Sequence, residues 1–365
     1  MEKAKISSSQ LFILIFLFEL GSAIVVGLGL QAKQDAWLAI LLGMLGGLVL
    51  FLIYIYLFYQ FPNLPLTSYI PKVLGKYVGY PLALLYILYF IYIASRVLRD
   101  FTDLLLTFAY PETPMFMIHL IMIALIIYAV CKGIETIART GEILVVVIIT
   151  YGVLGISFLF LSDAVRSENL LPILENGWKP VLTTAFPLTL TFPFGEMVVF
   201  AMLLPYLNQP KRGMKIGLSA MTLSGLVLTV TVAIDIAVLG TYFATTSTFP
   251  LLHAAQKINV GGFIQRLDPI VISTLIIGGF FKIAVFFYAA AAGVADLFKV
   301  RKRDPMIFSI GIVILIASIQ IAGNLPEHLE IGLEKVPIYL HLPFQVGIPL
   351  LLLIVTGIRK RYHHI

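Results

Sequence analysis

Long apolar runs separated by short polar connections dominate the chain. A membrane-spanning helix needs about 20 consecutive apolar residues. Ten runs approach or exceed that length: 10–30, 36–60, 80–109, 114–131, 141–161, 182–207, 215–240, 269–298, 305–324 and 336–358. The pattern predicts an all-α integral membrane protein, a single polytopic domain over 1–365 with about ten transmembrane helices. The first run carries Glu19 and lacks a small-residue cleavage site, so it is expected to remain as a membrane helix and not to be removed as a signal peptide.

Composition narrows the class further. Of the 365 residues, 60% are hydrophobic and 12% charged, which excludes a soluble enzyme. The one cysteine, Cys131, and the scattered histidines offer no disulfide and no metal-ligand cluster, so no metal or cofactor is expected. No nucleophile elbow, P-loop or dinucleotide fingerprint is present, and the glycines of LGMLGG at 42–47 are interpreted as a helix-packing face. These observations predict a protein that is not an enzyme.

The distribution of basic residues sets the orientation. The formal net charge is +6, but the 25 Lys and Arg residues are dispersed between apolar runs, which argues against nucleic acid as a partner. Most of them lie in connections on one side, such as 211–215 and 299–303, and in the segment 359–361. The positive-inside rule then places both termini in the cytoplasm. The two longest outer connections, 162–181 and 241–268, are expected to cap an outward-facing cavity, and 162–181, with Glu175 and Trp178, is alternatively a docking surface for partner subunits.

Two of the predicted spans contain helix-breaking residues beside a glutamate. Glu19 is followed by a glycine motif in span one, and Pro193 and Gly195 precede Glu196 in span six. Taken singly, such glycines and prolines are usually packing sites and tolerated kinks. Span one opens the first set of five, 10–161, and span six opens the second set, 182–358. Interruptions at corresponding places in two halves indicate two inverted five-helix repeats with a binding site between them.

The interrupted helices also indicate the chemistry of the ligand. Free N–H groups at a half-helix N-terminus suit a carboxylate, while exposed carbonyls and a glutamate suit an ammonium group. An amino acid fits that combination. The candidate ligand-binding residues are Glu19, Gly21, Ser22, Ala23, Phe192, Pro193, Phe194, Gly195 and Glu196.

Further charges lie within the spans. In span three, Arg96 can reach Asp100 and Arg99 can reach Asp103, and these pairs are interpreted as structural charge or as the lining of an outer vestibule. Lys282 in span eight has no acidic residue within a turn, so Glu19 or Glu196 is its expected counter-ion. We predict that it pairs with Glu19, or loses its proton, and thereby makes the site independent of sodium. Asp235, near the outer end of span seven, is expected to be solvated.

Several segments resemble the spore germination permease family, the B subunits of nutrient germinant receptors of bacterial endospores. They are GSAI at 21–24, FPNLPLTSYIPKVLGKYVG at 61–79, NLLPILENGWKP at 169–180, TFPFGE at 191–196 and LNQPKRG at 207–213. GSAI also resembles the helix-one motif of the amino acid, polyamine and organocation transporter superfamily. That likeness implies the fold of two inverted repeats, carboxylate contacts at Gly21, Ser22 and Ala23, and amine contacts around Phe192 to Gly195. The sequence departs from the motif where Glu19 precedes the glycine.

The resemblance implies a location in the inner spore membrane, partner A and C subunits, and a complex that senses an amino acid or sugar. Two functional classes stay open at this point: a receptor subunit that binds a nutrient and helps trigger germination, which the resemblance favours, and a proton-coupled amino acid permease. A channel that releases ions or small molecules is a weaker third.

Overall fold

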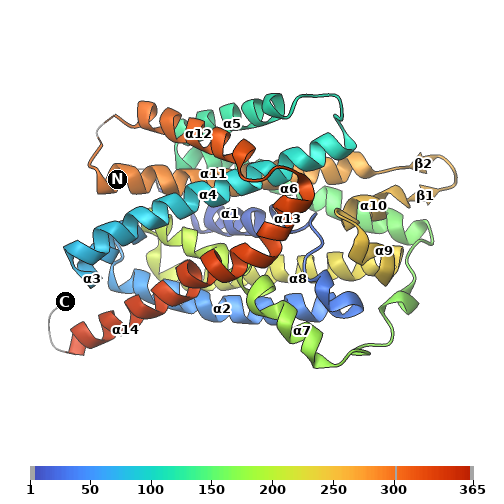
Figure 1. Cartoon of the computed structure of the whole chain (residues 1–365), viewed down its shortest axis with the longest axis horizontal. Helices are drawn as coiled ribbons and strands as arrows, with labels where there is room; N and C mark the ends of the chain where they lie inside the picture. The colour runs from blue at the N-terminus through green and yellow to red at the C-terminus, as the bar shows by residue number, and fades with distance from the viewer. Residues whose placement is uncertain (1–4, 301, 362–365) are drawn as a thin grey trace.

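The computed structural model describes residues 5–300 and 302–361, which form a bundle of helices elongated along one axis (Figure 1). The first half contains α1 (Ser8–Leu20), η1 (Leu30–Asp35), α2 (Ala36–Gln60), α3 (Leu66–Leu74), α4 (Lys76–Phe108), α5 (Met115–Lys132), α6 (Ile134–Leu161) and η2 (Ser167–Leu170). The second half begins with α7 (Trp178–Thr184), η3 (Ala185–Thr189), η4 (Phe194–Met202), η5 (Leu204–Tyr206), η6 (Pro210–Arg212), α8 (Gly213–Leu239), α9 (Thr241–Thr246) and α10 (Pro250–Gln256). It ends with β1 (Asn259–Val260), β2 (Ile264–Gln265), α11 (Asp268–Leu297), α12 (Arg303–Gln320), α13 (Leu325–Glu330), η7 (Ile331–Lys335), η8 (Pro337–Gly347) and α14 (Ile348–Arg361).

The predicted all-α membrane architecture is confirmed. Within the described residues, nine helical stretches are long and apolar enough to cross a membrane. The remaining predicted span, 10–30, is divided: α1 has 13 residues and ends at Gly21. A capping box starts α1, since Ser7 Oγ accepts from Gln10 N at 3.1 Å and Gln10 Oε1 accepts from Ser7 N at 2.9 Å.

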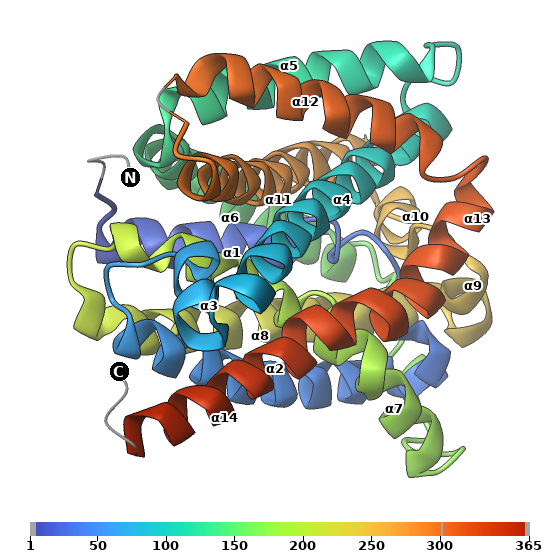
Figure 2. The same ribbon diagram turned by 60° about the vertical axis from the view of Figure 1, so that its left-hand side comes forward.

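The bundle has a central group of helices and two flanks. Helix α11 packs along α4 and contacts α1, while α5 and α12 lie together on one flank and α7 and α14 on the other (Figure 2). The glycines of α2 are a packing face, as predicted: a side chain at Gly43 would collide with Thr189, and one at Gly47 with Phe194. Close approach of α2 therefore holds the interrupted span six against the core.

The β1–β2 hairpin, α9 and α10 gather at one end of the bundle, on the right in Figure 1, which we call the hairpin end. Helix α14 ends at the opposite end. The connection before α7 is folded onto the bundle: Arg166 N donates to Ala237 O at 3.0 Å, and Leu174 N donates to Asp35 Oδ1 at 3.0 Å. This segment rests on α8 and η1. Asp235 is buried in α8, so the expectation that it is solvated is wrong; the same connection, hydrogen-bonded to Ala237, covers this end of α8.

Candidate functional site

Span one breaks at Gly21. Residues 21–29 form turns between α1 and η1, and Gly21 has φ +26°. A Cβ there would lie 2.6 Å from Lys282 Cδ and 2.8 Å from the Phe18 carbonyl oxygen, so only glycine fits. On the facing helix, a Cβ on Gly278 would lie 3.1 Å from Gly21 Cα. Two glycines thus let α11 lie directly against the break, which confirms the predicted interruption.

Span six is also interrupted, as predicted. Its first part, α7 and the π-helical η3, contains Phe186 in an extended conformation (φ −121°, ψ 119°). After Pro193 the chain continues as the 3₁₀ helix η4. Gly195 lies in this helix against Gln345, whose amide oxygen would collide with any side chain at 195. All residues of η4 are buried, and burial in protein is what allows irregular backbone at membrane depth.

A buried ion pair joins span eight to span six. Lys282 Nζ lies 2.5 Å from Glu196 Oε2, and neither side chain is more than 2% exposed. The ammonium group also lies 4.4 Å from the centre of the Phe192 ring and 5.3 Å from that of Phe18. Removing these charges from water is costly, and the close pairing with two aromatic faces offsets part of that cost.

The predicted pairing of Lys282 with Glu19 is wrong, and Glu196, the other candidate, is the counter-ion. Because Gly21 has no side chain, the stem of Lys282 passes over the break and reaches η4. Among the described residues, Glu19 forms no ion pair, and neither of its carboxyl oxygens has a hydrogen-bond partner. It is fully buried. Lys282 and Glu196 are its electrostatic neighbours.

In span three, one of the two predicted pairs is present. Arg99 Nε lies 2.8 Å from Asp103 Oδ2. Arg96 does not pair with Asp100: its Nη2 donates to the His328 carbonyl oxygen at 2.5 Å, while Asp100 Oδ1 lies 2.6 Å from His328 Nε2. Helix α13 packs against α4 and supplies nearer partners than the neighbouring turn of α4 does.

Span ten contributes polar groups that sequence reasoning missed. His341 Nδ1 lies 2.7 Å from the Tyr89 hydroxyl, which also accepts from Gln345 Nε2 at 2.8 Å. Tyr54 Oη donates to the Gln345 carbonyl at 2.5 Å, and Tyr86 Oη donates to that of Phe344 at 2.7 Å. These carbonyls belong to the π-helical η8, a rare form that is frequent at functional sites. The available signal was the i, i+4 spacing of His341 and Gln345 between Pro337 and Gly347.

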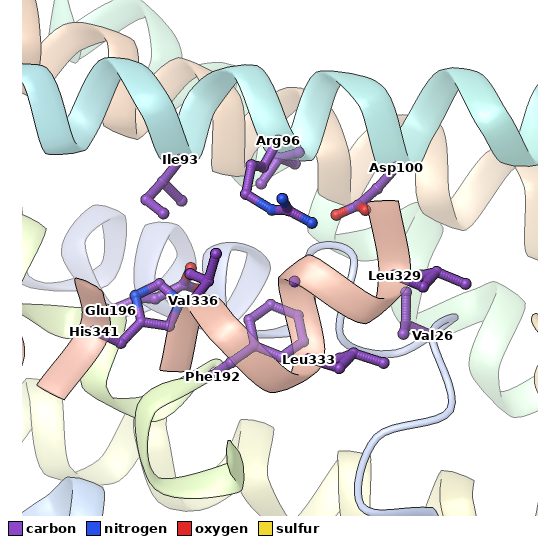
Figure 3. Close-up of a pocket in the computed structure, with 12 residues that line it drawn as sticks. Val26, Ile93, Arg96, Asp100, Phe192, Glu196, Leu329, Leu333, Val336 and His341 are labelled. Atoms are coloured by element: carbon purple, nitrogen blue, oxygen red, sulfur yellow. The ribbon is translucent and has the colours of Figure 1, made fainter. Parts of the chain in front are cut away.

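A small cavity lies between α4, span ten and the interrupted helices (Figure 3). Its volume is about 40 Å³, enough for about three water molecules. Arg96 and Asp100 project from α4 into this space, and Glu196 and His341 lie on the other side. Of the sequence-predicted residues, Phe192, Glu196, Arg96 and Asp100 line the cavity. Leu329 of α13 and Gly332 and Leu333 of η7 form part of the cavity wall.

The glycine motif lies beside the cavity and does not line it. Gly21, Ser22 and Ala23 are buried, and Ser22 Oγ has no hydrogen-bond partner in the described part of the chain. The Ser22 carbonyl accepts from Val25 N and Val26 N. Val26, at the end of this turn, reaches the cavity wall. Glu19, Pro193, Phe194 and Gly195 likewise surround the breaks without facing the cavity. Residues 5–300 and 302–361 contain no group of three His, Cys, Asp or Glu side chains placed to hold a metal ion.

Comparison with known proteins gives consistent results. The family model "Spore germination protein" matches residues 5–325. The chain is 45% identical to spore germination protein KB of Bacillus subtilis (strain 168), over 99% of this chain and 97% of that protein. It is 23% identical to spore germination protein YndE of the same organism, over 98% of each chain.

Among solved structures, MhsT in complex with L-phenylalanine superposes with a TM-score of 0.70 at 16% identity, covering 98% of this chain and 90% of that one. MHP1, a nucleobase-cation-symport-1 family transporter, gives a TM-score of 0.68 at 12% identity, covering 90% and 74%. At these identities the likeness establishes the fold, which is that of transporters with interrupted helices.

Proposed function

Because this chain belongs to the spore germination protein family, we propose that it is a membrane subunit of a spore nutrient germinant receptor, which binds a small nutrient at mid-membrane and helps trigger germination. The proposal rests on one observation: the interrupted spans one and six lie next to each other at a buried polar site. Gly21 and Gly195 mark the breaks, and the Lys282–Glu196 pair connects them through α11.

The nutrient we propose is an amino acid or a sugar. The unwound residues Gly21, Ser22 and Ala23 would contact a carboxylate, and the segment from Phe192 to Gly195, with Glu196, would contact an amine or hydroxyl group. The cavity of about 40 Å³ is smaller than such a ligand. Binding therefore requires α13 and η7 to move away from α4, so the ligand would favour an open conformation over the closed one.

The receptor proposal includes further subunits. We propose that the A and C subunits of the complex contact this chain in the inner spore membrane, with both termini on the cytoplasmic side. A conformational change at span ten would then be passed to them, so that nutrient binding acts on germination without net transport by this chain.

A second candidate is a proton-coupled amino acid permease. The buried carboxyl group of Glu19 favours it, because within the described residues this group has no hydrogen-bond partner, and isolated ionisable groups in membranes often mark proton paths. Uptake of labelled amino acids by proteoliposomes that contain this chain alone would support the permease and contradict a receptor that needs its partners.

The site assignment is tested by Gly195→Leu and Gly21→Leu. A bulky side chain at either break collides with Gln345 or Lys282, so we expect spores of both variants to lose the nutrient response, at least tenfold in germination rate. Gly357→Leu is the matched control, because a Cβ there meets no neighbour. Immunoblotting of spore membranes must show normal protein levels. Normal germination of both site variants would contradict the assignment, and loss of the protein would favour a packing role.

A further inference from the structure

A hollow with almost purely apolar walls lies away from the polar cavity. This α6 groove, of about 280 Å³, is bounded by α1, α6, α8, α10 and α11. Its walls are almost entirely Leu, Ile, Val, Phe, Ala and Gly, with Tyr151, Thr231 and Thr274 as the polar exceptions. The rest of the bundle covers helix α6 only loosely, and most residues of its apolar stretch are not buried. The groove therefore faces the hydrocarbon of the bilayer.

The groove spans the depth of one leaflet. Along α6 its wall extends from Leu159, near the hairpin end, to Ile148, which is about 16 Å at 1.5 Å per residue. The hydrocarbon core is about 30 Å thick. An extended acyl chain matches this length and the apolar walls of the groove. The charge at the mouth favours a phospholipid over a transmembrane helix of a partner.

The mouth of the groove carries positive charge. Ile258 and Leu267 form its wall at the hairpin end, and the basic residues Lys257 and Arg266 directly precede them in the sequence. Arg266 N donates to the Ile258 carbonyl at 3.4 Å, so the two segments lie side by side. The Arg266 side chain is 71% exposed, and its Nε lies 3.6 Å from Asp268. Its remaining N–H donors are free to meet a phosphate.

We propose that the α6 groove binds one acyl chain of an anionic phospholipid, whose phosphate is held by Lys257 and Arg266. The inner end of the groove is formed by Phe16, Leu20 and Ile24. Leu20 and Ile24 flank the break at Gly21, so a bound chain packs against the interrupted part of span one. The lipid thereby supports the turns that follow α1.

Two variants test the groove and its mouth separately. Gly155→Phe introduces a ring at a residue that lines the groove, and a Cβ at this position meets no atom within 4 Å. Gly357→Phe on α14 is the matched control, because its Cβ is equally free and it lies outside the groove. The double variant Lys257→Gln with Arg266→Gln removes the positive charges at the mouth of the groove. Lys179→Gln is its control, because it removes a positive charge from α7, which does not line the groove. Each full-length protein is purified from vesicles of equal phosphatidylglycerol and phosphatidylcholine, and retained lipid is measured by native mass spectrometry.

We expect the unaltered protein and both controls to retain phosphatidylglycerol in preference to phosphatidylcholine. Gly155→Phe should lower retention at least tenfold. The double Gln variant should lower the preference for phosphatidylglycerol roughly thirtyfold, since each basic residue near a membrane surface contributes about fivefold. Equal retention of the two lipids by the unaltered protein would overturn the proposal. So would unchanged retention in Gly155→Phe, or an unchanged preference in the double Gln variant, which leaves the helices intact.

Discussion

At the residue scale, the ion pair of Lys282 and Glu196 joins span eight to span six. Both are buried, and their charged atoms lie 2.5 Å apart between span eight and span six. Glu19 is equally buried and forms no ion pair or hydrogen bond among the described residues, although it interacts electrostatically with both charges of the pair. In the permease alternative, we expect Glu19 to be the group that exchanges a proton.

The pairing predicts a rescue. Lys282→Met leaves the Glu196 carboxylate buried and alone, and removing one partner of a buried pair typically costs about 3–5 kcal/mol. Adding Glu196→Gln should recover much of this loss, because no orphan charge remains. The measurement is the thermal unfolding midpoint in detergent, with Glu19→Gln plus Lys282→Met as the comparison. Equal recovery by Glu19→Gln and by Glu196→Gln would contradict the observed pairing.

At the element scale, the segment from α13 to η8, which leads into span ten, forms the wall of the site that faces α4. Helix α13 is fastened to α4 by Asp100 and Arg96, and η8 is fastened by the tyrosines of α2 and α4. Pro337 and the π-helical geometry of η8 loosen the element between these two attachments. A ligand that enters from the hairpin end must separate α13 from α4 and can leave the inner attachment in place.

The contact between α13 and α4 predicts that loosening it makes the cavity more accessible to solvent. His328→Ala removes the side-chain contact to Asp100, so a cysteine placed at Val26, in the cavity wall, should react faster with a membrane-impermeant maleimide. We expect an increase of severalfold in a Cys131→Ser background. His253→Ala, on α10 and outside the cavity lining, is the control. An unchanged rate in the His328 variant would show that α13 does not close the cavity.

The connection 162–177 is a second element with a prediction of its own. It is pinned to η1 and α8, with Glu175 Oε2 accepting from Gln34 Nε2 at 2.9 Å, and Trp178 just beyond it is 53% exposed. None of these residues lines the cavity, which leaves docking of partner subunits as the role we expect. Substituting Trp178 and Glu175 with Ala should reduce co-purification of the A and C subunits. If co-purification and germinant sensitivity are both unchanged, the segment is a plain linker.

At the scale of the whole molecule, the chain combines a transporter fold with membership of the spore germination family. Lys282 extends from α11 over the break of span one to Glu196. We expect a fixed ammonium group there to leave neither room nor charge for a sodium ion. We therefore expect nutrient responses, or any uptake by the chain alone, to be equal in sodium and in choline media. A response that rises severalfold with sodium concentration would refute this expectation.

The sequence by itself determined the membrane spans and the positions of the two helix breaks. The apolar runs are long enough to cross a bilayer only as helices, because unpaired backbone groups are not tolerated in hydrocarbon. The breaks at Gly21 and around Pro193 were predictable for a local reason: glycine accepts a positive φ, and proline removes a hydrogen bond. These features depend on neighbouring residues alone.

Tertiary structure decided which distant groups meet. The choice of Glu196 over Glu19 for Lys282 depends on how closely α11 approaches Gly21, which is a matter of packing between helices far apart in the sequence. Arg96 and Asp100 form no pair with each other because α13 presents His328 to both of them. The α6 groove likewise forms only where several helices pack together, so the sequence of one helix does not predict it. Side-chain partners in a membrane interior are set by the nearest satisfying group in space, whereas sequence spacing reports only the nearest group on the same helix.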